Sequence, residues 1–333
     1  MRDNSSATIQ IRPVVLARGQ SGLWFGLLGV AAFSFTVPFT KVAVAGLPPL
    51  FIGSGRAVVA AVLAGFALAL TRQRFPRGVQ WARLAVVAAG VVIGFPLLTS
   101  FALTTTRASH GAVVIALLPA ATATAAVLRG RERPPRAFWL ITGAGALAAI
   151  VFASMQAGGF GQLHFADLLL VGAVVAAAVG YAEGGLLARE LGPWQTVSWA
   201  LVLAAPLMVL LTTLSMAQQS PSATPVQWAA FAYLGVVSMF LGFFAWYRGL
   251  AIGPMAQVSQ IQLVQPVLSI CWAGLLLGES LTWSTVIGAL AVIACAGTAV
   301  RVRFKPAAPA AAPPAAAPVA KPEAIPATKF SSP

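Results

Sequence analysis

The sequence predicts an all-α polytopic membrane protein in which ten transmembrane helices form two inverted-topology five-helix repeats, with both termini cytoplasmic. Composition is the first observation, because 59% of the 333 residues are hydrophobic and only 8% are charged, whereas about 25% of a typical soluble protein is charged. The second is a series of apolar runs long enough to span a bilayer. The third is a pair of distant segments that place proline and glutamate at the same interval.

Apolar runs of spanning length follow one another along most of the chain. A helix needs about 20 mostly apolar residues to cross the hydrocarbon core, and short connections such as GLPP at 46–49 separate the runs. The first run is too long for the hydrophobic region of a cleaved signal peptide, so it is predicted to span. The ten predicted spans are 22–45, 50–70, 84–104, 109–128, 137–155, 167–188, 195–216, 227–249, 254–277 and 283–301.

The basic residues predict the orientation of these spans. With the N-terminus inside, 18 of the 21 Lys and Arg residues fall on the cytoplasmic side, which is the bias of a protein in the cell (inner) membrane. The net charge of +14 does not indicate a nucleic-acid partner, because the basic residues sit in short clusters between apolar runs. The three exceptions are Lys41, Arg56 and Arg107.

An internal repeat divides the spans into two groups of five. HGAVVIALLPAATATAAVLRGRE at 110–132 aligns with QVSQIQLVQPVLSICWAGLLLGE at 257–279, and 47–60 aligns with 191–204. The second copy must enter the membrane from the opposite side, because five is an odd number. The matched pairs are Pro119 with Pro266, Glu132 with Glu279, Pro49 with Pro193 and Ser54 with Ser198.

The repeat predicts the division of the chain. Residues 1–20 form a cytoplasmic N-terminal tail, 21–156 the first five-helix repeat and 157–302 the second. Residues 303–333 are rich in proline and alanine and cannot bury a core, so they are predicted to be a disordered cytoplasmic tail.

These motifs resemble the drug/metabolite transporter (DMT) superfamily, and within it the EamA-type members. The resemblance rests on Pro49 followed by Arg56 in span two, and on RASHGAVVIALLP…GRE and GPMAQVSQIQLVQP…GES, and it covers residues 20–302. It implies ten helices in two halves, a central cavity, and export of amino acids or other small metabolites. The second repeat has Ala200 where the first has Arg56, so that arginine would serve structure in one half only.

Ionisable side chains inside predicted spans are functional candidates, because charge is costly within a membrane. Glu183, near the cytoplasmic end of span six, could bind a substrate ammonium or relay a proton, or it could pair with a basic residue such as Arg189. Lys41, near the outer end of span one, has a structural or gating role or faces the cavity. Arg56 lies about 9 Å into span two at the usual helical rise; it is predicted to orient the bundle, with substrate contact as the alternative.

Span nine is rich in amides beside a proline. Pro266 removes a backbone donor and frees the carbonyl one turn earlier, which predicts a kink. Amides suit contacts between helices or a wet cavity, and the sequence favours cavity lining over interhelical hydrogen bonding. The cavity candidates of this span are Gln257, Gln260, Gln262, Gln265 and Ser269, and aromatic candidates elsewhere are Phe39, Tyr181, Trp246 and Tyr247.

Helix ends supply the remaining candidates. Glu132 and Glu279 end their helices at opposite faces, where an acid opposes the helix dipole, so they are predicted to cap facing helices. Pro119 and Pro266 are the repeated kink positions. His110, at the outer mouth of span four, could titrate near neutral pH or anchor the helix at the interface, and is assigned a structural or gating role.

The leading functional prediction is a secondary transporter that works by alternating access in the lipid bilayer on a small-molecule substrate, with no cofactor or metal. The chain has no Walker A loop, so ATP is not the direct energy source. The alternative is another solute class, such as a drug, sugar or nucleoside. A membrane-embedded lipid-modifying enzyme is disfavoured because the seven acidic residues are scattered. The oligomeric state, monomer or weak dimer, stays open.

Overall fold

The computed structural model describes residues 12–130, 134–156 and 165–278, together with single positions between 283 and 301. Every regular element in this part of the chain is helical, as the sequence predicts. Seven helical stretches within it are long and apolar enough to cross a membrane. They are Ser21–Val44, Pro49–Leu70, Val79–Thr105, Phe165–Leu191, Pro193–Gln218, Pro225–Ile252 and Met255–Leu277.

The first half begins with two helices, α1 (Arg12–Ser34) and α2 (Thr36–Val44), which meet at a break at Phe35. The third predicted span is also divided, since a π-helical segment interrupts it. The elements after the break are α3 (Pro49–Leu70), α4 (Val79–Val87), the π-helix η1 (Ala88–Gly94), α5 (Phe95–Thr105), α6 (Ala108–Ile115), α7 (Leu118–Gly130) and α8 (Arg136–Gln156).

The second half repeats this pattern with one difference: its first span is a single unbroken helix. A π-helix again interrupts its third span, and a 3-10 helix interrupts its fourth. The elements are α9 (Phe165–Leu191), α10 (Pro193–Gln218), α11 (Pro225–Tyr233), the π-helix η2 (Leu234–Leu241), α12 (Gly242–Ile252), α13 (Met255–Ser259), the 3-10 helix η3 (Gln260–Leu263) and α14 (Val264–Leu277).

The number of spans stays a prediction. The predicted fourth and fifth spans coincide with α6–α7 and α8, but neither is among the seven stretches that meet the length and apolarity of a span. The predicted tenth span, 283–301, falls mainly outside the described residues. Nine of the ten predicted spans therefore correspond to helical segments, and seven of them are long and apolar enough to cross a bilayer.

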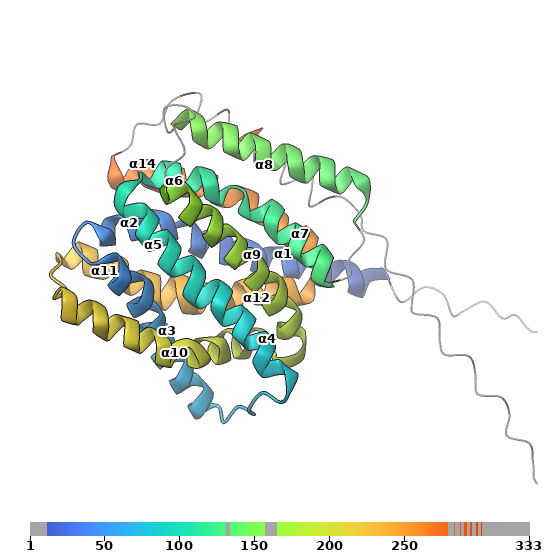
Figure 1. Cartoon of the computed structure of the whole chain (residues 1–333). Coiled ribbons are helices and arrows are strands. Elements are labelled where there is room, and N and C mark those ends of the chain that lie inside the picture. The colour runs from blue at the N-terminus through green and yellow to red at the C-terminus, as the bar shows by residue number, and fades with distance from the viewer. Residues whose placement is uncertain are drawn as a thin grey trace, which may run out of the picture.

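The two halves contact each other reciprocally, as expected for an inverted repeat. The first helix of each half packs along the third span of the other, so that α1 lies along α12 and α9 lies along α4, η1 and α5 (Figure 1). The second spans, α3 and α10, pack against each other. Helix α8 runs along the edge of the bundle beside α6 and α7. Because each half contacts the other through these reciprocal pairs of helices, the centre of the bundle lies at the interface between the two halves.

Small residues allow two of these crossings to be close. A Cβ on Gly90 would lie 2.4 Å from the Ala176 carbonyl oxygen, and one on Gly249 would lie 2.8 Å from the Gly22 carbonyl oxygen. Glycine allows such an approach because it has no side chain to separate the two helices. Gly278 has a different role, because it ends α14 in the left-handed region with φ of 72° and nothing within 4 Å of its Cβ position. It is the C-cap that such a conformation favours.

The outside of the bundle is apolar. Phe66, Leu140 and Leu168 are 69%, 74% and 68% exposed, which would be costly for a protein surrounded by water. Polar side chains such as Ser54, Ser100 and Thr196 are buried instead. This arrangement suits a surface that faces lipid.

Candidate functional site

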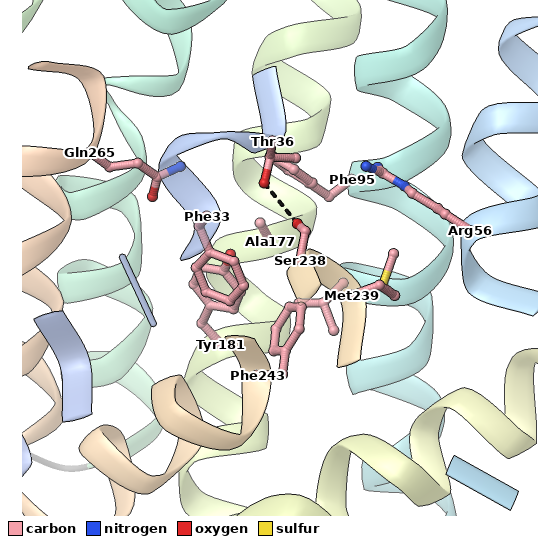
Figure 2. A pocket seen from close by; sticks show the side chains of 11 residues that line it. Phe33, Thr36, Arg56, Phe95, Ala177, Tyr181, Ser238, Met239, Phe243 and Gln265 are labelled. Atoms are coloured by element: carbon pink, nitrogen blue, oxygen red, sulfur yellow. Dashed lines mark hydrogen bonds between the residues drawn. The ribbon is translucent and has the colours of Figure 1, made fainter. Parts of the chain in front are cut away.

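A small cavity lies between the two halves, about midway along the helices that form it. Its volume is about 20 Å³, which is room for roughly one water molecule. Figure 2 shows the side chains that line it. The apolar ones are Phe33, Val91, Phe95, Ala177, Met239 and Phe243, and the polar ones are Thr36, Arg56, Tyr181, Ser238 and Gln265. Both halves therefore contribute to one site.

The two π-helices form part of this cavity. Val91 belongs to η1, and Ser238 and Met239 belong to η2. A π-helix widens the backbone and is frequent at functional sites, and here it occurs in the third span of both halves. Each segment contains the tripeptide Gly-Val-Val, at 90–92 and 235–237. Sequence reasoning missed both π-helices, and this shared tripeptide is the signal that could have paired them.

Arg56 is the only charged side chain among the residues that line the cavity. It is 1% exposed, and its Nε and Nη2 atoms have no hydrogen-bond partner among the described residues. In Figure 2 its side chain extends from α3 toward the hydroxyl groups of Thr36 and Ser238, whose oxygens are 2.7 Å apart. Arg56 was predicted chiefly to orient the bundle, with substrate contact as the alternative. The structure places it in the lining of the cavity.

Toward one end of the bundle, α9 is joined to α4 and α7 by ion pairs. The Glu183 carboxylate accepts hydrogen bonds from Arg83 of α4 and from Arg129 of α7, and Glu190 accepts one from Arg83. The Glu183 side chain is 4% exposed, whereas those of Arg129 and Glu190 are 57% and 46% exposed. We call these four residues the ionic end. The partners of Glu183 are thus Arg83 and Arg129, and the predicted candidate Arg189 is engaged elsewhere.

Toward the opposite end, α1 and α2 are joined to α11 and α14 by aromatic rings. Phe35 stacks on Trp272 with ring centroids 4.4 Å apart, and Phe39 packs edge-on against Tyr233 at 4.8 Å. We call Phe35, Phe39, Tyr233 and Trp272 the aromatic end. Phe39, a predicted cavity residue, belongs to this cluster and does not line the cavity.

Hydrogen bonds reinforce the aromatic end. The Tyr233 hydroxyl donates to the Ala32 carbonyl at 3.1 Å, and the Trp272 indole nitrogen donates to the Ser34 hydroxyl at 2.9 Å. Pro38 has no N–H to offer the Ser34 carbonyl one turn earlier, and Ser269 donates to that carbonyl at 2.7 Å. Ser269, predicted to line the cavity, therefore ties α14 to the break between α1 and α2.

Two cations near helix ends occupy corresponding places in the two halves. Lys41 donates to the carbonyls of Leu103 and Thr106, and Thr106 is the C-cap of α5. Arg189 donates to the carbonyls of Leu250 and Gly253, and Gly253 is the C-cap of α12. Cations are favourable at helix C-termini. Lys41, a predicted cavity candidate, does not line this cavity, and its two carbonyl contacts join α2 to the end of α5.

The amides of span nine do not lie on one continuous helix face. Gln257, Gln260, Gln262, Gln265 and Ser269 were all predicted to line the cavity, but the 3-10 helix η3 changes the helical periodicity over Gln260–Leu263. Gln265 lines the cavity. Gln260 and Gln262 are buried outside it, with both amide atoms of each unpaired, and Gln257 is half-buried. Helix breaks precede Pro266 in α14 and Pro119 in α7.

The other predicted residues are placed as follows. Tyr181 lines the cavity, and the fully buried Trp246 packs against its ring at 5.4 Å between centroids. Tyr247 donates to the Gly180 carbonyl at 3.2 Å, so it joins α12 to α9. Glu132 and Glu279 lie outside the described residues, as does the His110 side chain. Among the described residues, no three His, Cys, Asp or Glu side chains are grouped to hold a metal ion.

A helical membrane protein of two related halves, with a buried polar site between them, has the construction of a secondary transporter. The sequence profile of the EamA-like transporter family matches the chain twice, over residues 20–154 and 164–300. The chain belongs to the EamA-like transporter family, which confirms the resemblance seen in the motifs. It is a transporter and not an enzyme.

A curated relative and a solved structure agree with this assignment. The chain is 44% identical over 284 residues to the uncharacterized transporter YdeK of Bacillus subtilis (strain 168), covering 83% of this chain and 96% of YdeK. A crystal structure described only as that of a protein is 19% identical, with a TM-score of 0.68, and covers 84% of this chain and 96% of the other. At that identity the second likeness concerns the fold alone.

Proposed function

We propose that the chain transports a small metabolite, with amino acids as the first candidates, by alternating access through the cavity between its halves. The observation that carries this proposal is the position of the cavity between two differently built closures. The ionic end and the aromatic end each join three spans, and the cavity residues Thr36, Tyr181 and Gln265 lie between them. In alternating access, one closure opens while the other holds.

The bundle would sit in the cell membrane with ten spans and both termini in the cytoplasm, so that the ionic end faces the cytoplasm. Support for this orientation comes from the distribution of Lys and Arg, 18 of 21 on that side. Export is the direction that the family resemblance implies. Glu183, held by Arg83 and Arg129, would act mainly as part of the cytoplasmic closure.

Transport by purified protein in proteoliposomes tests this proposal. Vesicles preloaded with one amino acid should exchange it for the same labelled amino acid outside, across a panel that also contains sugars, nucleosides and cationic drugs. Exchange of amino acids or related metabolites above protein-free vesicles supports the proposal. Exchange confined to sugars, nucleosides or drugs would replace the substrate class, and no exchange of any solute would reject transport of these classes. Right-side-out and inside-out vesicles then give the direction.

A further inference from the structure

The buried guanidinium of Arg56 lacks a compensating charge. Two of its three nitrogens have no partner among the described residues, and the side chain is 1% exposed. Arginine stays protonated in proteins, and an unpaired buried ion is among the most costly groups that a fold can contain. A role in stabilising the bundle would need a hydrogen-bond partner for these nitrogens.

None of the side chains that line the cavity is acidic, so no lining residue neutralises this charge. Glu183 and Glu190 make their salt bridges with Arg83 and Arg129, toward the ionic end. The other side chains that line the cavity are uncharged, and Tyr181 is the one among them that can ionise. The cavity therefore presents a positive charge with nothing of the opposite sign along its lining.

The same cavity offers a hydrogen-bond acceptor without a donor. Gln265 lines it from α14 and is 5% exposed, and its Oε1 atom has no partner. Thr36 and Ser238 place two hydroxyl groups between the arginine and the amide, and Figure 2 shows Gln265 and Arg56 reaching toward this pair from opposite sides. The rings of Phe33, Tyr181 and Phe243 supply apolar surface.

We propose that Arg56 binds the carboxylate of the transported solute, with Gln265 accepting a hydrogen bond from a donor group on the same molecule. This inference rests on the proposed transport function and adds its recognition chemistry. The site would take a small solute with one negative charge, a nearby N–H or O–H group, and an apolar part packed on the rings. Guanidinium and carboxylate match as a two-pronged, charge-assisted pair.

Binding of matched probes tests the proposal on the purified full-length chain. Leucine, leucinamide, 3-methylbutylamine and 4-methylpentanoate differ only in the carboxylate and the amino group, and phenylalanine with its counterparts repeats the set with an aromatic part. Each is measured by its shift of the thermal unfolding midpoint. The acids should stabilise the protein and the amide and amine should not, since they lack the carboxylate. The amino acid should bind more tightly than the deaminated acid, because only the amino acid has the donor for Gln265.

Substitutions separate binding from structure. Arg56→Gln should weaken binding of the acids at least about tenfold, the usual loss for a hydrogen bond to a charged group. The affinity of Arg56→Lys should lie between those of the wild type and Arg56→Gln, because lysine keeps the charge but cannot form the two-pronged pair. Without a ligand, Arg56→Gln should unfold at a higher temperature than the wild type, since it removes an unpaired buried charge. Arg107→Gln, at an exposed arginine, is the matched control and should change neither property.

The outcomes distinguish this proposal from the transport function. Stabilisation by the amide or amine as strong as by the acids, or no stabilisation by any acid, overturns the carboxylate site. A lower unfolding midpoint for ligand-free Arg56→Gln than for Arg107→Gln also overturns it, because the guanidinium would then be structural. If the proteoliposomes exchange a solute without a carboxylate and Arg56→Gln keeps that rate, transport stands and the anion site falls.

Discussion

At the ionic end α9 meets α4 and α7, and at the aromatic end α1 and α2 meet α11 and α14. These are the same three spans of each half, the first of one half with the third and fourth of the other, exchanged by the inverted repeat. In the proposed mechanism, one closure consists of a buried carboxylate between two arginines, and the other consists of stacked rings with a few hydrogen bonds. Equivalent places in the two halves thus carry different chemistry.

The difference is visible at a single pair of positions. Glu183 precedes Pro193, the first residue of α10, by ten residues, and Phe39 precedes Pro49, the first residue of α3, by the same number. A charge at one position and a ring at the other make one closure sensitive to salt and charge substitution, and make the other depend on packed apolar area. A substitution at either end should therefore weaken one closure and leave the other unchanged.

Glu183→Gln is expected to have the largest effect, because it weakens the hydrogen bonds from both Arg83 and Arg129. Hydrogen bonds to charged groups contribute about 1.5–3 kcal/mol each, and the exposure of Arg129 reduces this. The net loss should be about 2 kcal/mol, which shifts the equilibrium roughly thirtyfold toward opening of the ionic end. Ala177→Cys places a thiol in the cavity, in a background with Cys271→Ser and Cys295→Ser. An impermeant maleimide should label it faster from the ionic side.

Glu190→Gln is the matched control for Glu183→Gln. It removes an acid that is 46% exposed and bonded to Arg83, while the buried Glu183 keeps both arginines. An exposed ion pair contributes about 0–1 kcal/mol, so labelling should change by a factor of about five at most. Equal effects of the two variants would show that burial of Glu183 does not matter to the closure.

Trp272→Ala should act at the opposite end with a smaller effect. It removes the stack on Phe35 and the hydrogen bond to Ser34, which contribute about 0.5–1.5 kcal/mol each. Labelling of the Ala177→Cys thiol should rise about tenfold from the aromatic side and stay unchanged from the ionic side. Trp24→Ala, at a ring that is 71% exposed, is the control. Faster labelling from the ionic side would contradict the assignment of Trp272 to the aromatic closure.

The sequence was sufficient to predict most helices because their length and apolarity are local properties. The predicted spans 50–70 and 254–277 lie within one residue of Pro49–Leu70 and Met255–Leu277. Proline at the first helical position explains why α3 and α10 begin where the pattern changes. The family followed from the spacing of a few motifs in the two repeats and is confirmed by the sequence profile.

Partners across the bundle could not be predicted in the same way, because they depend on which helices pack together. Arg189 is six residues from Glu183 and was the nearest basic candidate, yet it caps α12, while Glu183 binds arginines more than fifty residues away in sequence. Similarly, the 3-10 helix at 260–263 changes the helical register, so that Gln265 lines the cavity and Gln262 does not. A composition of buried amides predicts a polar interior but not which amide reaches the cavity.

The two C-cap cations extend the comparison with a smaller effect. Lys41→Gln and Arg189→Gln each remove a charge from a helix C-terminus, where it contributes about 0.3–1 kcal/mol. Each variant should lower the thermal unfolding midpoint by roughly 1–3 °C, and the two shifts should be similar because the sites correspond. Arg74→Gln, at an exposed residue, is the control and should leave the midpoint unchanged. A large shift for one variant alone would show that the two caps are not equivalent.

Ionic strength should have the smallest effect and should act at one end only. Raising salt from about 0.01 M to about 1 M shortens the screening length from roughly 30 Å to 3 Å. The exposed part of the ionic end, Arg129 and Glu190, is open to this screening, whereas the Glu183 carboxylate is 4% exposed. Labelling of the Ala177→Cys thiol from the ionic side should therefore rise by a factor of about two, and labelling from the aromatic side should stay constant. Because Glu183→Gln leaves the Arg83–Glu190 pair as the remaining ion pair of the ionic end, the same salt change should have a smaller effect in that variant. A salt response as large in Glu183→Gln as in the wild type, or one that occurs equally at both ends, would mean that Glu183 is not the group through which salt acts on the closure.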